Sequence, residues 1–157
     1  LVPSPQVATY DLVPAMSAPQ VTERLLANLV NYDLVVVNYA NLDMVGHTGD
    51  MRATVSAVEK VDSCVGHLVQ AIRQVGGTLV LTADHGNAEQ MLDLTTGEPH
   101  TAHTGNPVPF LVMAPGVTKL RGQGVLADIA PTILQLLQLA QPNAMTGRSL
   151  LAVNEPS

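Results

Sequence analysis

The chain has 157 residues, 46% of them hydrophobic and 13% charged, which is enough apolar material for one domain with a buried core. A net charge of −6, no tryptophan and one phenylalanine argue against nucleic acids and anionic membrane surfaces as partners. The single cysteine, Cys64, excludes an internal disulfide and fits a reducing compartment such as the cytoplasm, and no apolar run is long enough to span a bilayer.

The first quarter of the sequence predicts a loop, a helix and a buried strand. Residues 1–16 contain three prolines and are predicted to be a loop. Ser17 and Gln20 resemble a capping box, which predicts a helix that continues to about Val30. Residues 33–39 form a nearly unbroken apolar run rich in β-branched side chains, which is typical of a strand buried in a parallel sheet.

The rest of the chain continues the alternation of helices and strands. Residues 51–74 are predicted to be a long amphipathic helix closed by two glycines. Its apolar face is predicted to contain Val55, Val58, Val61, Val65, Leu68 and Ile72. Two more buried strands are predicted at 78–82 and 109–113, separated by a polar hairpin or loop around 95–97. Asp128 is predicted to cap a last helix, so the fold class is α/β with a mostly parallel sheet in one domain or one incomplete domain.

Three short stretches contain the residue types that bind divalent cations. They are Asp43 with His47, Asp84 with His85, and His100 with His103. Two of these stretches follow predicted strands, at the edge where open α/β sheets place their active sites. One carboxylate and two imidazoles with an open position are typical of a catalytic ion. A second ion nearby would allow the pair of ions to hold the attacking and leaving oxygens during a displacement reaction at phosphorus.

Each stretch taken alone also has an ordinary structural explanation, and only their joint placement favours a metal site. The residues by themselves leave open whether His103 or His100 completes the set. Four polar residues are candidates to hold the imidazoles in place: Asn87, Glu89, Thr101 and Thr104. His67 is predicted to be a surface or half-buried structural residue of the long helix, and Cys64 a small core residue.

Eight ordered motifs resemble a known family. They are residues 2–5 (Val-Pro-Ser-Pro), 7–12 (Val-Ala-Thr-Tyr-Asp-Leu), 38–41 (Asn-Tyr-Ala-Asn), 43–49 (Asp-Met-Val-Gly-His-Thr-Gly), 82–91 (Thr-Ala-Asp-His-Gly-Asn-Ala-Glu-Gln-Met), 100–104 (His-Thr-Ala-His-Thr), 106–109 (Asn-Pro-Val-Pro) and 126–132 (Leu-Ala-Asp-Ile-Ala-Pro-Thr). Together they closely resemble the C-terminal part of the cofactor-independent (2,3-bisphosphoglycerate-independent) phosphoglycerate mutases, which belong to the alkaline phosphatase superfamily.

This resemblance implies a three-layer α/β/α, alkaline-phosphatase-like fold and an isomerase of glycolysis. The family interconverts 3-phosphoglycerate and 2-phosphoglycerate through a phosphoserine, with two divalent ions that are usually manganese. Carried over by position, Asp43, His47 and His103 are ligands of one ion, and Asp84 and His85 belong to the shell of the second. The Thr-Ala-His-Thr motif favours His103 over the other candidate histidine.

Other family features have no counterpart in the sequence: an N-terminal strand ending in Asp-Gly, a nucleophilic serine and an arginine-rich inserted domain. Gln6 and Leu42 stand where the family commonly has lysine and proline. We therefore expect residues 1–157 to be the C-terminal portion of a metal-binding phosphatase-like domain. We expect this portion to be inactive alone, to hold the second ion weakly or not at all, and to self-associate through an exposed sheet edge.

Two alternatives remain open at this point. One is another phosphomutase or phosphatase of the same superfamily, such as a phosphopentomutase-like enzyme, which the sequence upstream of Leu1 would distinguish. The other is a non-catalytic metal-binding or assembly module that kept the ligands and lost the chemistry.

Overall fold

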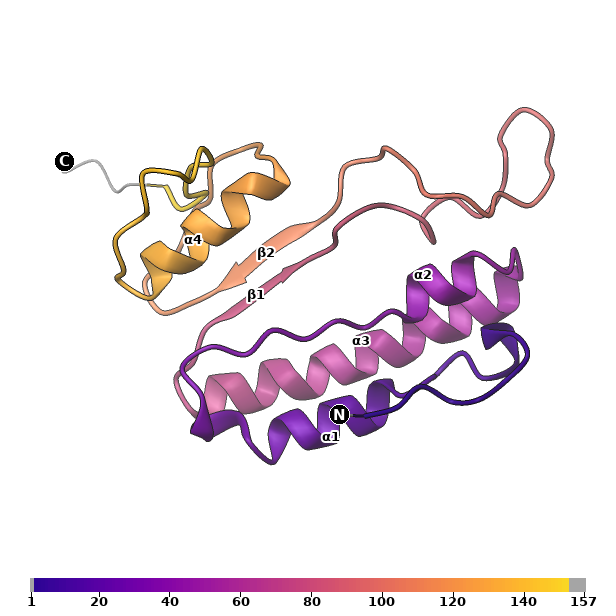
Figure 1. Cartoon of the computed structure of the whole chain (residues 1–157), viewed down its shortest axis with the longest axis horizontal. Coiled ribbons are helices and arrows are strands. Elements are labelled where there is room, and N and C mark those ends of the chain that lie inside the picture. The colour runs from indigo at the N-terminus through magenta and orange to yellow at the C-terminus, as the bar shows by residue number, and fades with distance from the viewer. Residues whose placement is uncertain (1, 153–157) are drawn as a thin grey trace. The chain divides into compact units, whose positions relative to one another are not determined.

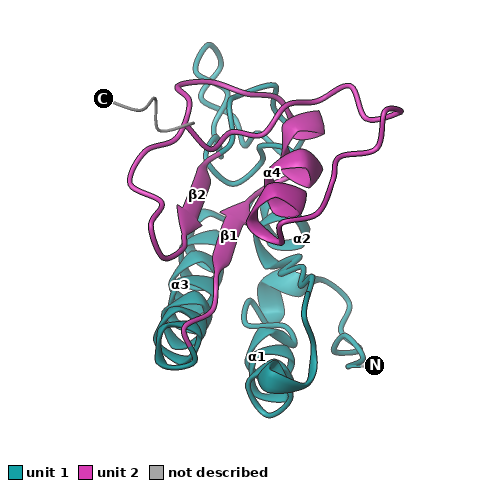
Figure 2. Ribbon diagram, turned by 90° about the vertical axis from the view of Figure 1, so that its left-hand side faces the viewer, with its two compact units in different colours: residues 1–75, 85–108 teal, residues 76–84, 109–157 magenta. Residues whose placement is uncertain are grey.

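The computed structural model describes residues 2–152, which divide into two compact units (Figures 1 and 2). Among the described residues, the first unit contains residues 2–75 and 85–108, and the second contains residues 76–84 and 109–152. Within the described residues, no helix has the length and apolar character needed to cross a membrane. This division does not test the predicted domain boundaries, which remain a prediction.

The long helix α3 (Met51–Gln74) is the centre of the first unit and has the predicted bounds. Its first turn is fixed by the side chain of Asp50, which accepts a hydrogen bond from the amide of Ala53 at 2.8 Å. Its end is followed by Gly76, whose φ of 66° is the left-handed conformation that closes many helices.

The buried face of α3 differs from the predicted valine face. Its buried residues are Ala53, Thr54, Ala57, Cys64, Leu68 and Ile72. Leu68, Ile72 and the core position of Cys64 are therefore confirmed, whereas Val55 and Val58 are exposed. Small side chains allow the other helices of the unit to approach α3 closely, so they form the packed face although the valines are more hydrophobic.

Two shorter helices, α1 (Ala18–Leu26) and α2 (Asn41–Gly46), pack against α3. The predicted capping box of α1 is wrong, because the hydroxyl of Ser17 donates instead to the carbonyl of Pro3 at 2.6 Å. The α1 helix ends before the predicted Val30, and a 3-10 turn (η2, Leu29–Asn31) follows. Another such turn, η1 (Tyr10–Leu12), contacts α2 and α3.

The apolar run at 33–39 is extended but is not a strand within the described part of the chain. Leu34, Val35, Val36 and Val37 are all exposed, and Val36 reaches 84%. The prediction of a buried strand is therefore wrong for this structure. An apolar run becomes a strand only when a neighbouring strand satisfies its backbone groups, and no described strand pairs with this segment.

The second unit contains β1 (Leu79–Thr82) and β2 (Phe110–Met113), which form a two-stranded sheet. The strands are antiparallel, with Leu79 opposite Met113, so the predicted parallel sheet is wrong for the described strands. The helix α4 (Ile129–Leu136) follows a 3-10 turn, η3 (Leu126–Asp128). The described chain is thus an incomplete α/β arrangement, with helices and a small sheet.

Asp128 is the N-cap residue of α4, as predicted, but its carboxylate does not bind the amides of that helix. One carboxylate oxygen accepts from the amide of Arg148 at 2.7 Å and the other from the amide of Val125 at 3.0 Å. These hydrogen bonds, with the Arg148 amide as the largest contributor, hold the pKa of Asp128 below its usual value. The carboxylate thus ties a later segment of the chain to the start of α4.

Candidate metal centre

Helix α2 places Asp43 and His47 on one face, because residues four apart are neighbours on a helix surface. Val45 lies between them in sequence and is fully buried in a core that it shares with Ala53 and Ala57 of α3. Burial of Val45 therefore turns the other face of this short helix outward. On that face, Asp43 Oδ1 lies 3.1 Å from His47 Nε2.

His103 reaches the same point from a loop far along the chain. Its Nε2 atom lies 3.1 Å from Asp43 Oδ1 and 3.0 Å from His47 Nε2. The ring of His85 stacks on that of His103, with ring centres 3.8 Å apart and planes inclined by 19°. Asp43, His85 and His103 each offer a ligand atom within 4.8 Å of the others.

The structure thus brings together four of the five residues predicted as metal ligands. The fifth, Asp84, belongs to the second unit although it directly precedes His85 in the chain, and its role stays a prediction. The alternative histidine, His100, has a buried Nδ1 atom without a hydrogen-bond partner among the described residues. His67 is exposed on α3, as predicted.

The hydrogen bond made by the Nδ1 atom of His47 shows which of its two ring nitrogens carries the proton. Its Nδ1 atom lies 2.6 Å from the carbonyl oxygen of Thr101. Because a carbonyl oxygen can only accept a hydrogen bond, Nδ1 must carry the proton. In the neutral ring, Nε2 then presents a lone pair toward Asp43 and His103, as a metal-binding imidazole does.

The spacing of these three side chains fits a divalent cation. Ligand atoms on adjacent corners of a tetrahedron or octahedron, with bonds of about 2.1 Å, are about 3.0–3.4 Å apart. The three separations in the cluster are 3.0 to 3.1 Å. The side chains of Asp43, His47 and His103 are 34%, 40% and 49% exposed, so a further ligand can approach from solvent.

A second group of polar residues forms hydrogen bonds to the cluster and to one another. Asn87 is 5% exposed and donates from Nδ2 to Asp43 Oδ1 at 3.1 Å. The carboxylate of Glu89 accepts from the amide of Asn87 at 2.6 Å, from the hydroxyl of Thr104, and from Asn106 Nδ2 at 2.9 Å. The Thr104 hydroxyl, more than any other contact, holds the pKa of the Glu89 carboxyl below its usual value.

Sequence reasoning named most of these supporting residues but gave two of them the wrong task and missed one. Glu89 accepts from Asn87 and Thr104, and Thr104 donates to Glu89, so neither holds an imidazole, whereas Thr101 does orient the His47 ring, through its main-chain carbonyl. The missed residue is Asn106, which lies within the motif at 106–109. Its proximity to the cluster motifs in sequence is the only signal that could have indicated it.

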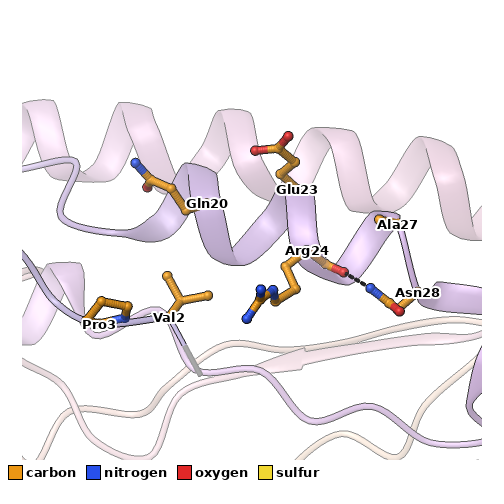
Figure 3. A pocket seen from close by; sticks show the side chains of 7 residues that line it. All are labelled: Val2, Pro3, Gln20, Glu23, Arg24, Ala27 and Asn28. Carbon is orange, nitrogen blue, oxygen red and sulfur yellow. Dashed lines mark hydrogen bonds between the residues drawn. The ribbon is translucent and has the colours of Figure 1, made fainter.

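One hollow of the first unit lies apart from these residues. It has a volume of about 450 Å³ and is formed by α1 and the segment that leads to it (Figure 3). Its lining residues are Val2, Pro3, Gln20, Glu23, Arg24, Ala27 and Asn28. None of them is a predicted ligand, so the cluster and not this hollow is the candidate site.

Comparison with family models decides the class to which this arrangement belongs. Residues 1–141 match the model of the metalloenzyme superfamily. The chain belongs to the metalloenzyme superfamily. A cluster of one carboxylate and several imidazoles is what such an enzyme needs to bind its ion.

Several known proteins are closely similar to this chain in sequence. The chain is 58% identical over 153 residues to a 2,3-bisphosphoglycerate-independent phosphoglycerate mutase of Pseudomonas fluorescens, and 60% identical over 162 residues to one of Cyanothece. Each match covers 96% of this chain and 30% of the relative. The chain therefore spans about a third of the length of these relatives, and the resemblance seen in its motifs is confirmed.

A solved structure gives the same result. The chain is similar to a crystal structure of Leishmania mexicana phosphoglycerate mutase at low cobalt concentration, with a TM-score of 0.84 and 33% identity. The similarity covers 98% of this chain and 31% of that one.

Proposed function

We propose that the chain is the metal-binding portion of a cofactor-independent phosphoglycerate mutase, which interconverts 3-phosphoglycerate and 2-phosphoglycerate through a phosphoserine. The observation that carries this proposal is the convergence of Asp43, His47 and His103 on one point, with ligand atoms 3.0 to 3.1 Å apart. The high identity to relatives with this name supports the substrate class. The nucleophilic serine and the substrate-binding domain are proposed to lie outside these residues.

In this proposal, Asp43, His47 and His103 bind one divalent ion, and Asp84 and His85 contribute to a second. Bound cations would supply Lewis-acid stabilisation of the charge that develops on the phosphoryl oxygens. The residues of the chain contribute orientation. The Thr101 carbonyl keeps the proton of His47 on Nδ1, and the stack of His85 on His103 restricts both rings.

The finer parts of the assignment belong to the same proposal. We propose manganese as the ions, a three-layer α/β/α alkaline-phosphatase-like domain as the complete fold, and a cytoplasmic location. We also propose that the exposed run Leu34–Val37 promotes self-association of this chain, because unpaired extended apolar segments template pairing with another chain.

Titration calorimetry with manganese chloride tests the metal assignment. The wild-type chain should bind, and His103→Ala should lower affinity by at least ~100-fold, because loss of a ligand exceeds loss of a group that only orients one. His67→Ala, which removes an exposed imidazole of α3, is the matched control and should bind as the wild type does. Equal affinity of His103→Ala and wild type would remove the assignment.

A mutase assay tests the proposal that the chain binds the metal while the nucleophile lies outside it. The 157-residue chain should show no interconversion of the two phosphoglycerates with manganese present, because the proposed nucleophile lies elsewhere. Turnover by the purified chain would contradict this, and would require a nucleophile within the sequence.

A further inference from the structure

Asn87 is the buried polar residue that contacts the candidate centre most directly. Its Nδ2 atom lies 3.1 Å from Asp43 Oδ1, 3.4 Å from the main-chain oxygen of Asp43 and 3.5 Å from His47 Nε2. The opposite orientation of the carboxamide would place an oxygen against the Asp43 carboxylate, which is repulsive. Asn87 therefore presents its donor to the carboxylate and restricts the rotation of that group.

This close approach depends on Gly46, which lies between Asp43 and His47 on α2. A Cβ atom at position 46 would overlap Asn87 Oδ1 and lie 3.0 Å from Asn87 Cγ. Asn87 Oδ1 is buried without a hydrogen-bond partner among the described residues. The carboxamide is therefore held by its donor side and by its fit against Gly46, and a methyl group at 46 must displace it.

The backbone of Asn87 is anchored separately. Its amide donates to Glu89 at 2.6 Å, and the same carboxylate binds the hydroxyl of Thr104, the residue after His103. Glu89 thus links the segment that carries Asn87 to the loop that carries His103. The same hydrogen-bonded network therefore holds the residue that contacts Asp43 and the loop that positions His103.

We propose that Asn87 is a positioning residue of the metal centre, which aims the carboxylate of Asp43 at the cation, and that Gly46 is required because it admits the Asn87 carboxamide. The inference rests on the proposed function, in which Asp43 is a ligand. Partners that orient metal ligands are worth about 10- to 100-fold in metal affinity. We expect a loss of that size when Asn87 is removed or displaced.

A double-mutant cycle tests this coupling in the 157-residue chain. Calorimetry with manganese chloride should show about 10- to 100-fold weaker binding for both Asn87→Ala and Gly46→Ala. The double variant should bind no more weakly than Asn87→Ala, because Gly46→Ala acts only by displacing a side chain that is then gone. Gly66→Ala, at an exposed α3 position with nothing within 4 Å of the new Cβ, is the matched control. Additive losses in the double variant would overturn the proposal.

A second measurement needs no cation. In the metal-free chain, the side-chain NH₂ resonances of Asn87 should exchange slowly with solvent, and Gly46→Ala should abolish this protection while Gly66→Ala preserves it. Unchanged protection in Gly46→Ala would overturn the role of Gly46. If the wild type binds manganese and Asn87→Ala binds equally well, the inference fails and the proposed function stands. If the wild type binds no cation, the proposed function fails and the role of Asn87 toward a bound ion falls with it.

Discussion

His47 Nδ1 donates a hydrogen bond to the main-chain carbonyl of Thr101 at 2.6 Å, between residues 54 apart in sequence. This contact determines which ring nitrogen can bind a cation. It also joins α2 to the loop that carries His103. The orientation of the His47 ring and the position of the His103 ring therefore depend on the same contact.

Because the acceptor is a main-chain atom, Thr101→Ala should keep manganese affinity within about twofold of wild type. His47→Ala should lower it by at least ~100-fold, since a ligand is lost. Metal content of the purified proteins after dialysis against manganese measures both effects. A large loss in Thr101→Ala would show that the side chain, and not the carbonyl, supports the site.

The carboxylate of Asp128 should make the unfolding free energy depend on pH in the acid range. Its folded pKa is lowered, chiefly by the Arg148 amide, so its stabilisation is complete above the unfolded pKa of about 3.9. That stabilisation is lost as pH falls through the lower, folded value. Urea unfolding between about pH 5 and pH 2.5 should show a smaller gap between wild type and Asp128→Asn at the acid end. A constant gap across this range would contradict the prediction.

Two glycines at one helix should respond oppositely to alanine. Gly76 has a φ of 66° after the end of α3, so Gly76→Ala should lower the unfolding free energy by about 1 kcal/mol through backbone strain. Gly66 is exposed within the helix, so Gly66→Ala should raise it by about 0.5–1 kcal/mol. Urea unfolding of both variants provides the measurement, and effects of the same sign would argue against this account.

The exposed run Leu34–Val37 should control self-association. Val36→Lys places a charge at a side chain that is 84% exposed, so it should shift the chain toward monomer and change the unfolding free energy by less than about 0.5 kcal/mol. Sedimentation velocity over a range of concentrations measures the shift. Leu94→Lys, at a side chain that is 91% exposed and lies outside this run, is the control and should leave the association unchanged.

The sequence predicted best those features that depend on local contacts. The bounds of α3 follow from periodicity and from the glycine after it, whose effects act within a few residues. The segment 33–39 shows the limit, because its apolar run indicates a strand but carries no information on whether a partner strand is present. The same limit explains the wrong strand direction of β1 and β2, since an apolar run reads alike in parallel and antiparallel pairs.

The sequence predicted the residues that converge at the candidate site and named most of the residues that support them, but it did not predict the contacts that hold them in place. Carboxylates and imidazoles are rare enough for their grouping in three motifs to be informative, and Asp43, His47, His85 and His103 do converge. The carbonyl that orients His47 has no sequence signal, because every residue carries one. The fit of Asn87 against Gly46 depends on a spatial approach that neither motif reveals alone.

His47 and His103, whose ring nitrogens lie 3.0 Å apart, are separated by 56 positions in the chain. A cation bound by both would be a reversible cross-link that closes this whole loop, including all of α3. A permanent bridge of that span would remove about 4 kcal/mol of chain entropy from the unfolded state. A bound cation would then hold the 85–108 segment in its folded position. Removal of the cation by a chelator should therefore expose this segment to proteases before the rest of the chain.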